Sequence, residues 1–262
     1  MPRVTIHHEN HIAHVRLTRP DKMNAVDAEM IAAVIAAAEE VAASTARVCV
    51  LSGEGRAFCA GTDVSAFDSS SARDPISGLI ARTHGAGTTN KFQEFALIWQ
   101  RLPQPVIAAL HGPVFGAGFQ LALGADIRIA GPDAKLALME ARWGLVPDMG
   151  GMILLPKLVR SDVIRYMTYT AQPIEAAQAQ TWGLVTELAD DPLAAAFELA
   201  ATIAQKSPAA TRVAKELIAL AETAPAEEVL LAESRAQTEL IGGPDQREII
   251  AATQEGRTPV FK

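Results

Sequence analysis

The sequence predicts an α/β protein whose last third is helical. As far as about residue 150, apolar residues at helical spacing alternate with short runs rich in β-branched residues, and from Met152 onward only the helical spacing recurs. The composition agrees, because 49% apolar and 20% charged residues are typical of a globular chain. Repeated strand-then-helix units predict the α/β body, and helices that follow without strands predict a cap or an assembly surface.

A hairpin and a β–α–β unit are predicted at the N-terminus. Residues 4–6 and 12–17 alternate in polarity as two strands around a turn at Glu9-Asn10. Asp27 is a plausible N-cap for a helix whose apolar residues recur at helical spacing as far as Val41. The β-rich run 47–51 then completes the unit.

The remaining elements follow from the same periodicities. We expect residues 68–90, which are rich in Ser, Gly, Thr and Ala, to form a mobile loop. A helix is predicted from Phe92 to Pro103, and strands at 105–110, 126–130 and 135–138. The helices expected beyond Met152 lie at 162–169, 174–181, 193–205, 209–222 and 227–241.

Histidines and cysteines do not predict a metal site. His7, His8, His11 and His14 lie on two strands around a turn, so we expect them at solvated hairpin positions. Cys49 and Cys59 are too few for a disulfide framework and have no zinc-like partners, so both are expected to be small core residues.

Charge and hydropathy exclude several classes of protein. The net charge is −7 and the chain has no Lys/Arg-rich run, so we expect no nucleic-acid partner. The N-terminus has no apolar core of a signal peptide, which predicts a cytoplasmic location. Residues 106–123 are nearly apolar over membrane length, but a proline, a histidine, Gln120 and three glycines within them indicate a buried segment instead of a membrane span.

Two glycine-rich loops each follow a predicted strand. The first ends in Ala60-Gly61-Thr62-Asp63, and the second is Gly116-Ala117-Gly118. If the loops meet, their N–H groups could bind one carbonyl oxygen from two directions and form an oxyanion hole. The alternative is two ordinary strand-to-helix turns. Neither loop has the Lys and glycine spacing of a phosphate-binding or dinucleotide-binding motif.

Three polar side chains could act near such a turn. Gln120 lies two residues beyond Gly118 and cannot exchange a proton. Glu140 ends the predicted strand at 135–138, and Asp148 follows eight residues later, so two carboxylates on one tight loop could transfer protons. The alternative pairs Glu140 with Arg142 or Arg128 and makes Asp148 the cap of a helix that starts near residue 150.

Together and in this order, the motifs resemble those of the enoyl-CoA hydratase/isomerase, or crotonase, family. The resemblance spans almost the whole chain through RPDKMNAVD, GRAFCAGTDV, VIAALHGPVFGAGFQLALGADIRIA, LMEARWGLVPDMGG, AAQAQTWGLVTEL and PVFK. It implies a spiral of β–β–α units in which residues 1–200 form an acyl-CoA-binding catalytic core. Residues 201–262 would form a helical trimerisation region, giving a homotrimer or a dimer of trimers. Coenzyme A would enter as part of the substrate, with no other cofactor.

The resemblance also implies roles for the loop residues. The thioester carbonyl would lie between the N–H groups of Thr62 and Ala117, where Ala117 departs from the family's usual glycine. The adenine would rest near Ala60, with Lys22 or Lys215 as phosphate partners. Residues 68–90 and those near Trp143 would surround the acyl group. The CoA-binding set is Lys22, Ala60, Gly61, Asp63 and Lys215.

The family's catalytic positions favour isomerisation. Hydratases of the family carry glutamates at the positions of Gln120 and Glu140, whereas dienoyl-CoA isomerases carry Asp at that of Asp148. We therefore expect an enoyl- or dienoyl-CoA isomerase in which Glu140 and Asp148 move protons. The alternative is a hydratase that uses Glu140 while Gln120 positions water. Dehalogenases of the family have an aromatic residue where this chain has Glu140, so this residue argues against a dehalogenase. A non-catalytic CoA-binding or RNA-binding scaffold is the remaining possibility.

Overall fold

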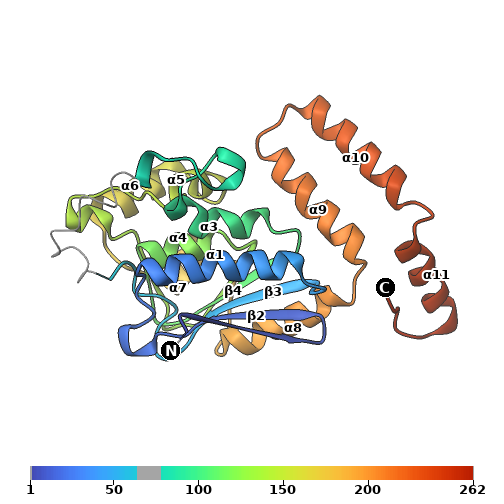
Figure 1. Cartoon of the computed structure of the whole chain (residues 1–262), viewed down its shortest axis with the longest axis horizontal. Coiled ribbons are helices and arrows are strands. Elements are labelled where there is room, and N and C mark those ends of the chain that lie inside the picture. Colours follow the sequence, from blue (N-terminus) through green and yellow to red (C-terminus); the bar gives the residue numbers. More distant parts are fainter. Residues whose placement is uncertain (1, 64–77, 262) are drawn as a thin grey trace.

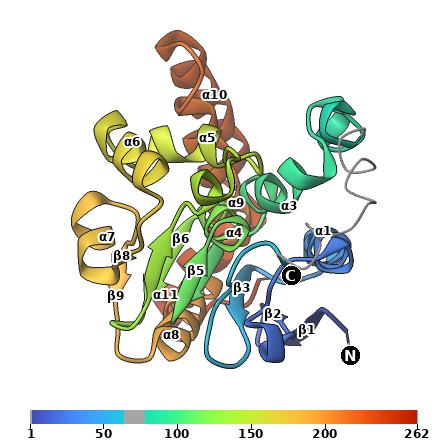
Figure 2. The same ribbon diagram turned by 90° about the vertical axis from the view of Figure 1, so that its left-hand side faces the viewer.

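A computed structural model of the chain, which describes residues 2–63 and 78–261, confirms the α/β class. The larger of its two sheets has the strand order β1-β2-β3-β4-β6-β9, and the smaller one has the order β5-β7-β8 (Figures 1 and 2). The strands of the larger sheet are β1 (Val4–Glu9), β2 (Ile12–Leu17), β3 (Val48–Gly53), β4 (Val106–Leu110), β6 (Ile127–Ala130) and β9 (Glu187–Leu188). Those of the smaller sheet are β5 (Pro113–Phe115), β7 (Lys135–Ala137) and β8 (Ile174–Glu175).

The predicted hairpin and β–α–β unit are both present. Strands β1 and β2 pair antiparallel with His7 opposite His14, and β2 runs parallel to β3. Helix α1 (Ala28–Ala43) connects them and begins where Asp27 accepts a hydrogen bond from the Met30 N–H at 2.8 Å. This cap satisfies one of the free N–H groups at the start of the helix, as the sequence predicted.

Helices cover both faces of the larger sheet. On one face lie α1, α3 (Lys91–Arg101) and α4 (Ala117–Leu123), and on the other lies α8 (Pro192–Ala204). Successive residues of β3 alternate between the two cores: Cys49 and Leu51 face the α1 side, and Val48 and Val50 face α8. Burial on both faces explains why these strands read as continuous apolar runs.

The two cysteines are core residues, as expected. Both are completely buried, and burial raises the pKa of each thiol to about 12. The thiolate is the reactive form of cysteine, so both side chains act as small apolar groups at physiological pH.

One histidine of the hairpin differs from the prediction. His14 is not solvated: its Nε2 lies 2.8 Å from Ser52 Oγ, and its ring packs edge-on against Phe197. Burial lowers the pKa of His14 to about 4, so the ring is neutral. Sequence periodicity could not show this, because α8 brings Phe197 under the sheet from far along the chain. Within residues 2–63 and 78–261, no group of three His, Cys, Asp or Glu side chains is placed to hold a metal ion.

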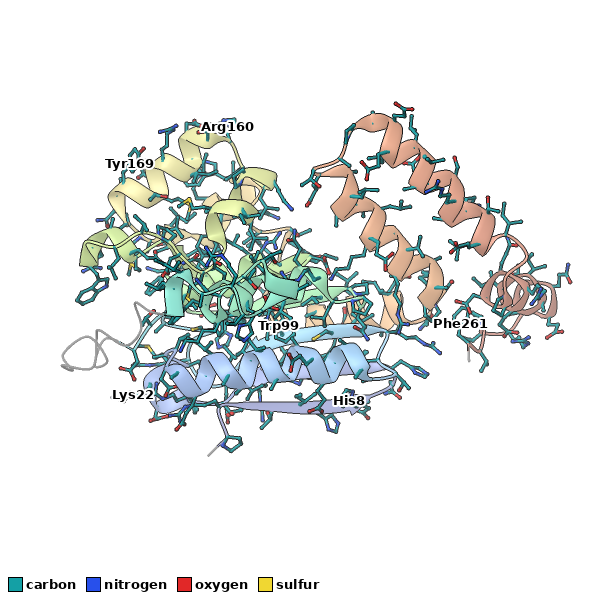
Figure 3. All side chains as sticks on the ribbon, turned by 45° about the horizontal axis from the view of Figure 1, so that its top comes forward. His8, Lys22, Trp99, Arg160, Tyr169 and Phe261 are labelled. Atoms are coloured by element: carbon teal, nitrogen blue, oxygen red, sulfur yellow. The ribbon has the colours of Figure 1, made fainter. Side chains whose placement is uncertain are left out.

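The C-terminal third is less uniformly helical than predicted. The two-residue strands β8 and β9 interrupt it: β9 extends the larger sheet beside β6, and β8 extends the smaller one beside β7. Strands this short carry no period that a sequence could reveal. The helices around them are α5 (Gly151–Leu154), α6 (Ser161–Thr170) and α7 (Ala176–Trp182). Figure 3 shows Arg160 and Tyr169 on the outer side of α6, and Tyr169 is 70% exposed.

Three helices project from the body at the C-terminal end. They are α9 (Pro208–Ala221), α10 (Ala226–Leu240) and α11 (Pro244–Glu255), of which the last was not predicted (Figure 1). The expected boundary at residue 200 falls inside α8, where Ala196, Ala200 and Ala204 form one buried stripe under the sheet. The projecting region therefore begins at α9. Phe261 returns to the body, where its ring lies 5.2 Å from the Arg47 guanidinium.

Lys215 connects α9 to the body. Its ammonium donates to Asp126 Oδ2 at 2.8 Å and to the carbonyls of Trp99 and Gln104 at 3.2 and 3.0 Å. Burial lowers the pKa of Lys215 and raises that of Asp126, and the ion pair opposes both effects. The lysine side chain is only 11% exposed, so its ammonium depends on these three acceptors to compensate for the water it has lost.

We expect Lys215→Met to lower the free energy of unfolding by roughly 1 to 2 kcal/mol, since it removes the ion-pair partner of a carboxylate that is partly exposed and keeps the Val106 N–H. Urea denaturation of the variant measures the loss. Arg160→Gln, which removes the exposed pair with Asp162, is the matched control and should unfold like the parent protein. A Lys215→Met variant as stable as that control would contradict the connecting role.

The expected loop at 68–90 is described only in part. Residues 68–77 lie outside the described residues. The rest contains a turn closed by pairing of His84 with Thr89 and ends at Asn90, which caps α3 through a reciprocal capping box with Gln93. None of the helices in the described part of the chain is long and apolar enough to cross a membrane.

Candidate active site

The two glycine-rich loops meet. The Phe115 N–H donates to the Cys59 carbonyl at 3.0 Å, and the Cys59 N–H donates to the Pro113 carbonyl at 3.1 Å. Gly61 has a φ of +94°, and a Cβ there would lie 2.8 Å from the Phe115 carbonyl oxygen and 3.8 Å from the Ala117 nitrogen. Only glycine permits this approach. The condition set by the sequence, that the two loops meet, is therefore fulfilled, and a shared target stays a prediction.

Two N–H groups at this junction have no acceptor. The Val26 N–H donates to the Gly61 carbonyl, and the Asp63 N–H donates to the Val26 carbonyl, so Thr62 lies between two paired residues and its own N–H is not used in this pairing. Ala117 is the first residue of α4, so its N–H has no helical acceptor. Neither group donates to any atom of residues 2–63 or 78–261. Ala117 has ordinary helical backbone, so the position does not require the glycine that is usual in the family.

Gln120 is completely buried, and both ends of its amide are bound. Its Oε1 accepts from the N–H groups of Met149 and Gly151, each at 3.0 Å. Its Nε2 donates to Glu140 Oε1 at 2.7 Å. Two backbone donors thus fix which end of the amide faces the carboxylate. Sequence reasoning missed these donors, because nothing in the chain indicates that the start of α5 packs on α4.

Glu140 lies beside the candidate oxyanion turn, the junction where the two glycine-rich loops meet. It begins the short 3-10 helix η5 (Glu140–Trp143), and a Cβ at Gly116 would lie 3.6 Å from its Oε1. Its Oε2 is buried and has no hydrogen-bond partner among the described residues. Burial raises the pKa of Glu140; the Gln120 amide opposes this shift, and the charge of Asp148 adds to it. A carboxylate with a raised pKa and one unoccupied oxygen suits a general base.

The alternative that Glu140 forms an ion pair with an arginine is wrong. The Arg128 guanidinium is buried and donates instead to the carbonyls of Leu184 and Ala125. Arg142 makes no ion pair with Glu140 or with any other residue described in the structure. The carboxylate of Glu140 is therefore held by an amide and keeps its charge uncompensated.

Asp148 has a more open position than Glu140. The residue as a whole is exposed, yet partial desolvation of its carboxylate raises its pKa. It does not cap α5, because the N-cap of that helix is Gly150, which has no side chain to accept a bond. The carboxylate is close enough to influence the pKa of Glu140. Two carboxylates on one loop, each with its pKa raised above the ordinary value, could accept and return a proton.

A cavity of about 200 Å³ opens in front of these groups. Residues 60–62, 116–117 and five side chains between positions 139 and 145 line it, with Glu140 among them and Asp148 outside. Drug-sized ligands occupy pockets of about 300 to 1,000 Å³, so this space suits only a small part of a larger ligand. Thr62, Ala117 and Glu140 all line this one open cavity.

The CoA-binding residues expected from sequence are only partly together. Ala60 and Gly61 line the cavity. Lys22 is exposed, and it lies near Ala60 because the Ala60 N–H donates to the carbonyl of the next residue, Met23, at 2.9 Å. Figure 3 shows Lys22 at the end of the molecule far from Phe261. Asp63 instead pairs with Arg19 at 2.9 Å. Lys22 stays a candidate for a phosphate contact, whereas the Asp63 carboxylate neutralises an arginine.

The assignment of Lys215 to this site is wrong. Its partner Asp126 precedes β6 and receives the Val106 N–H at the start of β4, so Lys215 lies at the N-terminal edge of these parallel strands. The oxyanion turn lies at the opposite edge, at the other end of α4, whose seven residues span about 10 Å. The sequence of a predicted helix does not indicate which edge of the sheet a basic residue on that helix will contact.

Comparisons with known proteins agree with this geometry. The family description "Enoyl-CoA hydratase/isomerase" matches residues 7–262. A 2,3-dehydroadipyl-CoA hydratase of Escherichia coli is 30% identical, with 100% of this chain and 99% of that protein covered. A mouse mitochondrial Delta(3,5)-Delta(2,4)-dienoyl-CoA isomerase is 32% identical, with 79% and 65% covered. The crystal structure of a Bacillus anthracis enoyl-CoA hydratase superposes with a TM-score of 0.88, at 28% identity and 99% coverage of both chains.

The contact between two glycine-rich loops, a half-buried glutamate beside it and a family match over nearly the whole sequence therefore agree, and the chain belongs to the enoyl-CoA hydratase/isomerase family.

Proposed function

We propose that this family member is an enoyl- or dienoyl-CoA double-bond isomerase. The observation that carries the proposal is the set of hydrogen bonds made by the buried Gln120 amide. Its oxygen accepts from two backbone N–H groups, and its nitrogen donates to Glu140. A hydratase with two acidic groups would need a second carboxylate at this position. Here the amide orients Glu140 and exchanges no proton.

In the proposed reaction, Glu140 Oε2 takes a proton from the carbon next to the thioester carbonyl. The electron pair of the broken C–H bond moves into the conjugated system, and the Thr62 and Ala117 N–H groups stabilise the negative charge on the carbonyl oxygen. Asp148, acting in its protonated form, donates its proton to the distant carbon, where the electron pair forms the new C–H bond; the upward shift of its pKa favours that form. Exchange with solvent then restores both carboxyl groups.

Hydration is the second candidate, and one observation favours it. Glu140 Oε2 is buried without a partner, so it could bind and activate a water molecule by itself. The role expected for Gln120 in that mechanism, positioning the water, is weakened because its Oε1 already accepts two hydrogen bonds. The relatives of known activity include both kinds of enzyme.

A single experiment separates these candidates. The protein is incubated with a panel of enoyl- and dienoyl-CoAs in deuterated water while ultraviolet absorbance and product mass are followed. Isomerisation changes the absorbance and exchanges deuterium without adding water, whereas hydration adds the mass of water. A protein that binds the thioesters but changes neither observable would be a non-catalytic CoA-binding scaffold.

The pH dependence of kcat should follow Glu140. A general base must be deprotonated, so turnover falls as the pH drops through its pKa. Burial raises the pKa of Glu140, so the acid limb should lie above the pH at which an ordinary glutamate titrates. Gln120→Leu removes the hydrogen bond that favours the charged form and should move this limb to still higher pH. An unchanged limb in that variant would show that Glu140 is not the titrating group.

The projecting helices support a proposal about assembly. Exposed apolar side chains recur on α9, α10 and α11, among them Ile218, Leu230, Leu231, Ile249 and Ile250. Such surfaces on a water-exposed chain mark interaction sites. We therefore expect a homotrimer or a dimer of trimers, and sedimentation at micromolar concentration should give at least three times the chain mass of 27.8 kDa. A stable monomer would contradict it.

A further inference from the structure

Arg142 is an unpaired cation in the wall of the active-site cavity. It lies on η5 two residues after Glu140, and its side chain lines the cavity. It makes no side-chain hydrogen bond or ion pair with residues 2–63 or 78–261. The other arginines near the site differ: Arg19 binds Asp27 and Asp63, and Arg128 binds two backbone carbonyls.

The surroundings of Arg142 are mostly apolar. Met139, Trp143 and Leu145 line the same cavity, as Glu140 does; Arg142 is exposed, and Trp143 and Leu145 are 56% and 51% exposed. An acyl chain that covers these side chains would also remove water from the neighbouring guanidinium. A desolvated charge without a partner costs free energy, whereas a planar carboxylate can accept two hydrogen bonds from an arginine. The site therefore favours a ligand that brings an anionic oxygen group of its own.

The position of Arg142 indicates which part of the ligand carries that group. Arg142 shares a segment with Glu140, which faces the reacting carbons, and the candidate CoA contacts Ala60 and Lys22 lie on other segments. Relying on the proposed acyl-CoA function, we propose that Arg142 binds a carboxylate at the far end of the acyl group. The substrates are then CoA thioesters of dicarboxylic acids.

Binding of unreactive saturated thioesters tests this proposal without requiring turnover. The probes are hexanoyl-CoA, adipyl-CoA, which has a carboxylate in place of the terminal methyl group, and the pantetheine thioesters of both acids. Calorimetry measures their Kd with the parent protein, with Arg142→Gln, and with Arg16→Gln. The last removes an equal charge at an exposed position on β2, away from the cavity, and serves as the matched control.

We expect Arg142→Gln to weaken binding of adipyl-CoA roughly tenfold, the effect of losing one charge-assisted hydrogen bond of about 1.4 kcal/mol, and to change hexanoyl-CoA binding by less than twofold. The same difference should persist in the pantetheine pair, which lacks the nucleotide phosphates. Arg16→Gln should behave like the parent protein.

Three results would overturn the proposal. Equal weakening of both CoA thioesters, with neither pantetheine thioester affected, would place the phosphates of CoA on Arg142. Equal affinities in the parent protein and Arg142→Gln would remove any role in binding. Equal losses of affinity in Arg142→Gln and Arg16→Gln would show that the effect comes from the net charge of the protein and not from a contact with Arg142. Failure of the parent protein to bind any of the four probes is a different outcome, because it contradicts the acyl-CoA function on which the proposal rests.

Discussion

Glu140→Gln is expected to lower turnover by about 100-fold to 10,000-fold, the usual contribution of a general acid or base. The substitution keeps the size of the side chain but removes its ability to accept a proton, and Glu140 is the carboxylate that lines the cavity beside the oxyanion turn. Steady-state kinetics with the best substrate of the thioester panel measures the loss. Binding of a saturated thioester should stay within a few-fold of the parent value, which separates lost chemistry from lost binding.

Two controls sharpen this expectation. Glu175→Gln makes the same chemical change at an exposed residue that pairs with Lys135 and should leave turnover unaltered. Asp148→Asn should remove most turnover if both carboxylates move protons, and only a small part if Glu140 works alone as a hydratase. Activity that stays within threefold of the parent in both Glu140→Gln and Asp148→Asn would contradict the whole catalytic assignment.

Gln120→Glu should lower the native turnover about 100-fold at neutral pH and introduce some addition of water. One oxygen of the new carboxylate can accept the Met149 and Gly151 N–H groups, as the amide oxygen does now. The other would face Glu140 Oε1, where the amide donates at 2.7 Å in the parent protein. Two carboxylates at this distance share one proton, so one pKa of the pair rises and a larger fraction of the pair holds a proton at a given pH than Glu140 alone does.

The pH–rate profile and the product mass measure this effect together. The acid limb of the variant should lie at higher pH than that of the parent, and the variant should regain activity as the pH rises. Gln120→Leu is the companion variant, because it also removes the amide but adds no charge, so it should not gain any addition of water. A Gln120→Glu enzyme with the parent profile and product would show that position 120 does not contact the base.

Local sequence determined much of the fold. The hairpin, the Asp27 cap, and the strands and helix of the β–α–β unit each have a local pattern of residues, so they were visible in the chain, whereas α11 was missed. The short strands β8 and β9 were missed, because each exists through pairing with a strand elsewhere and has no pattern of its own.

The candidate site divides in the same way. The glycines that let two loops approach each other, and the carboxylates at Glu140 and Asp148, are properties of residue type and could be found in the sequence. Their roles as oxyanion donors and proton carriers came from the order of motifs shared with a family. Lys215 was misassigned because charge alone does not reveal to which edge of the sheet a helix delivers it.

Tertiary packing alone decided what Gln120 does. The sequence determined that position 120 holds an amide without a usable proton, which weakened a mechanism with two acidic groups there. Only the folded chain brings the start of α5 against α4, so that the Met149 and Gly151 N–H groups bind the amide oxygen and turn its nitrogen toward Glu140. The physical reason is that an amide offers a donor and an acceptor in any sequence, and its orientation depends on partners that lie far away along the chain.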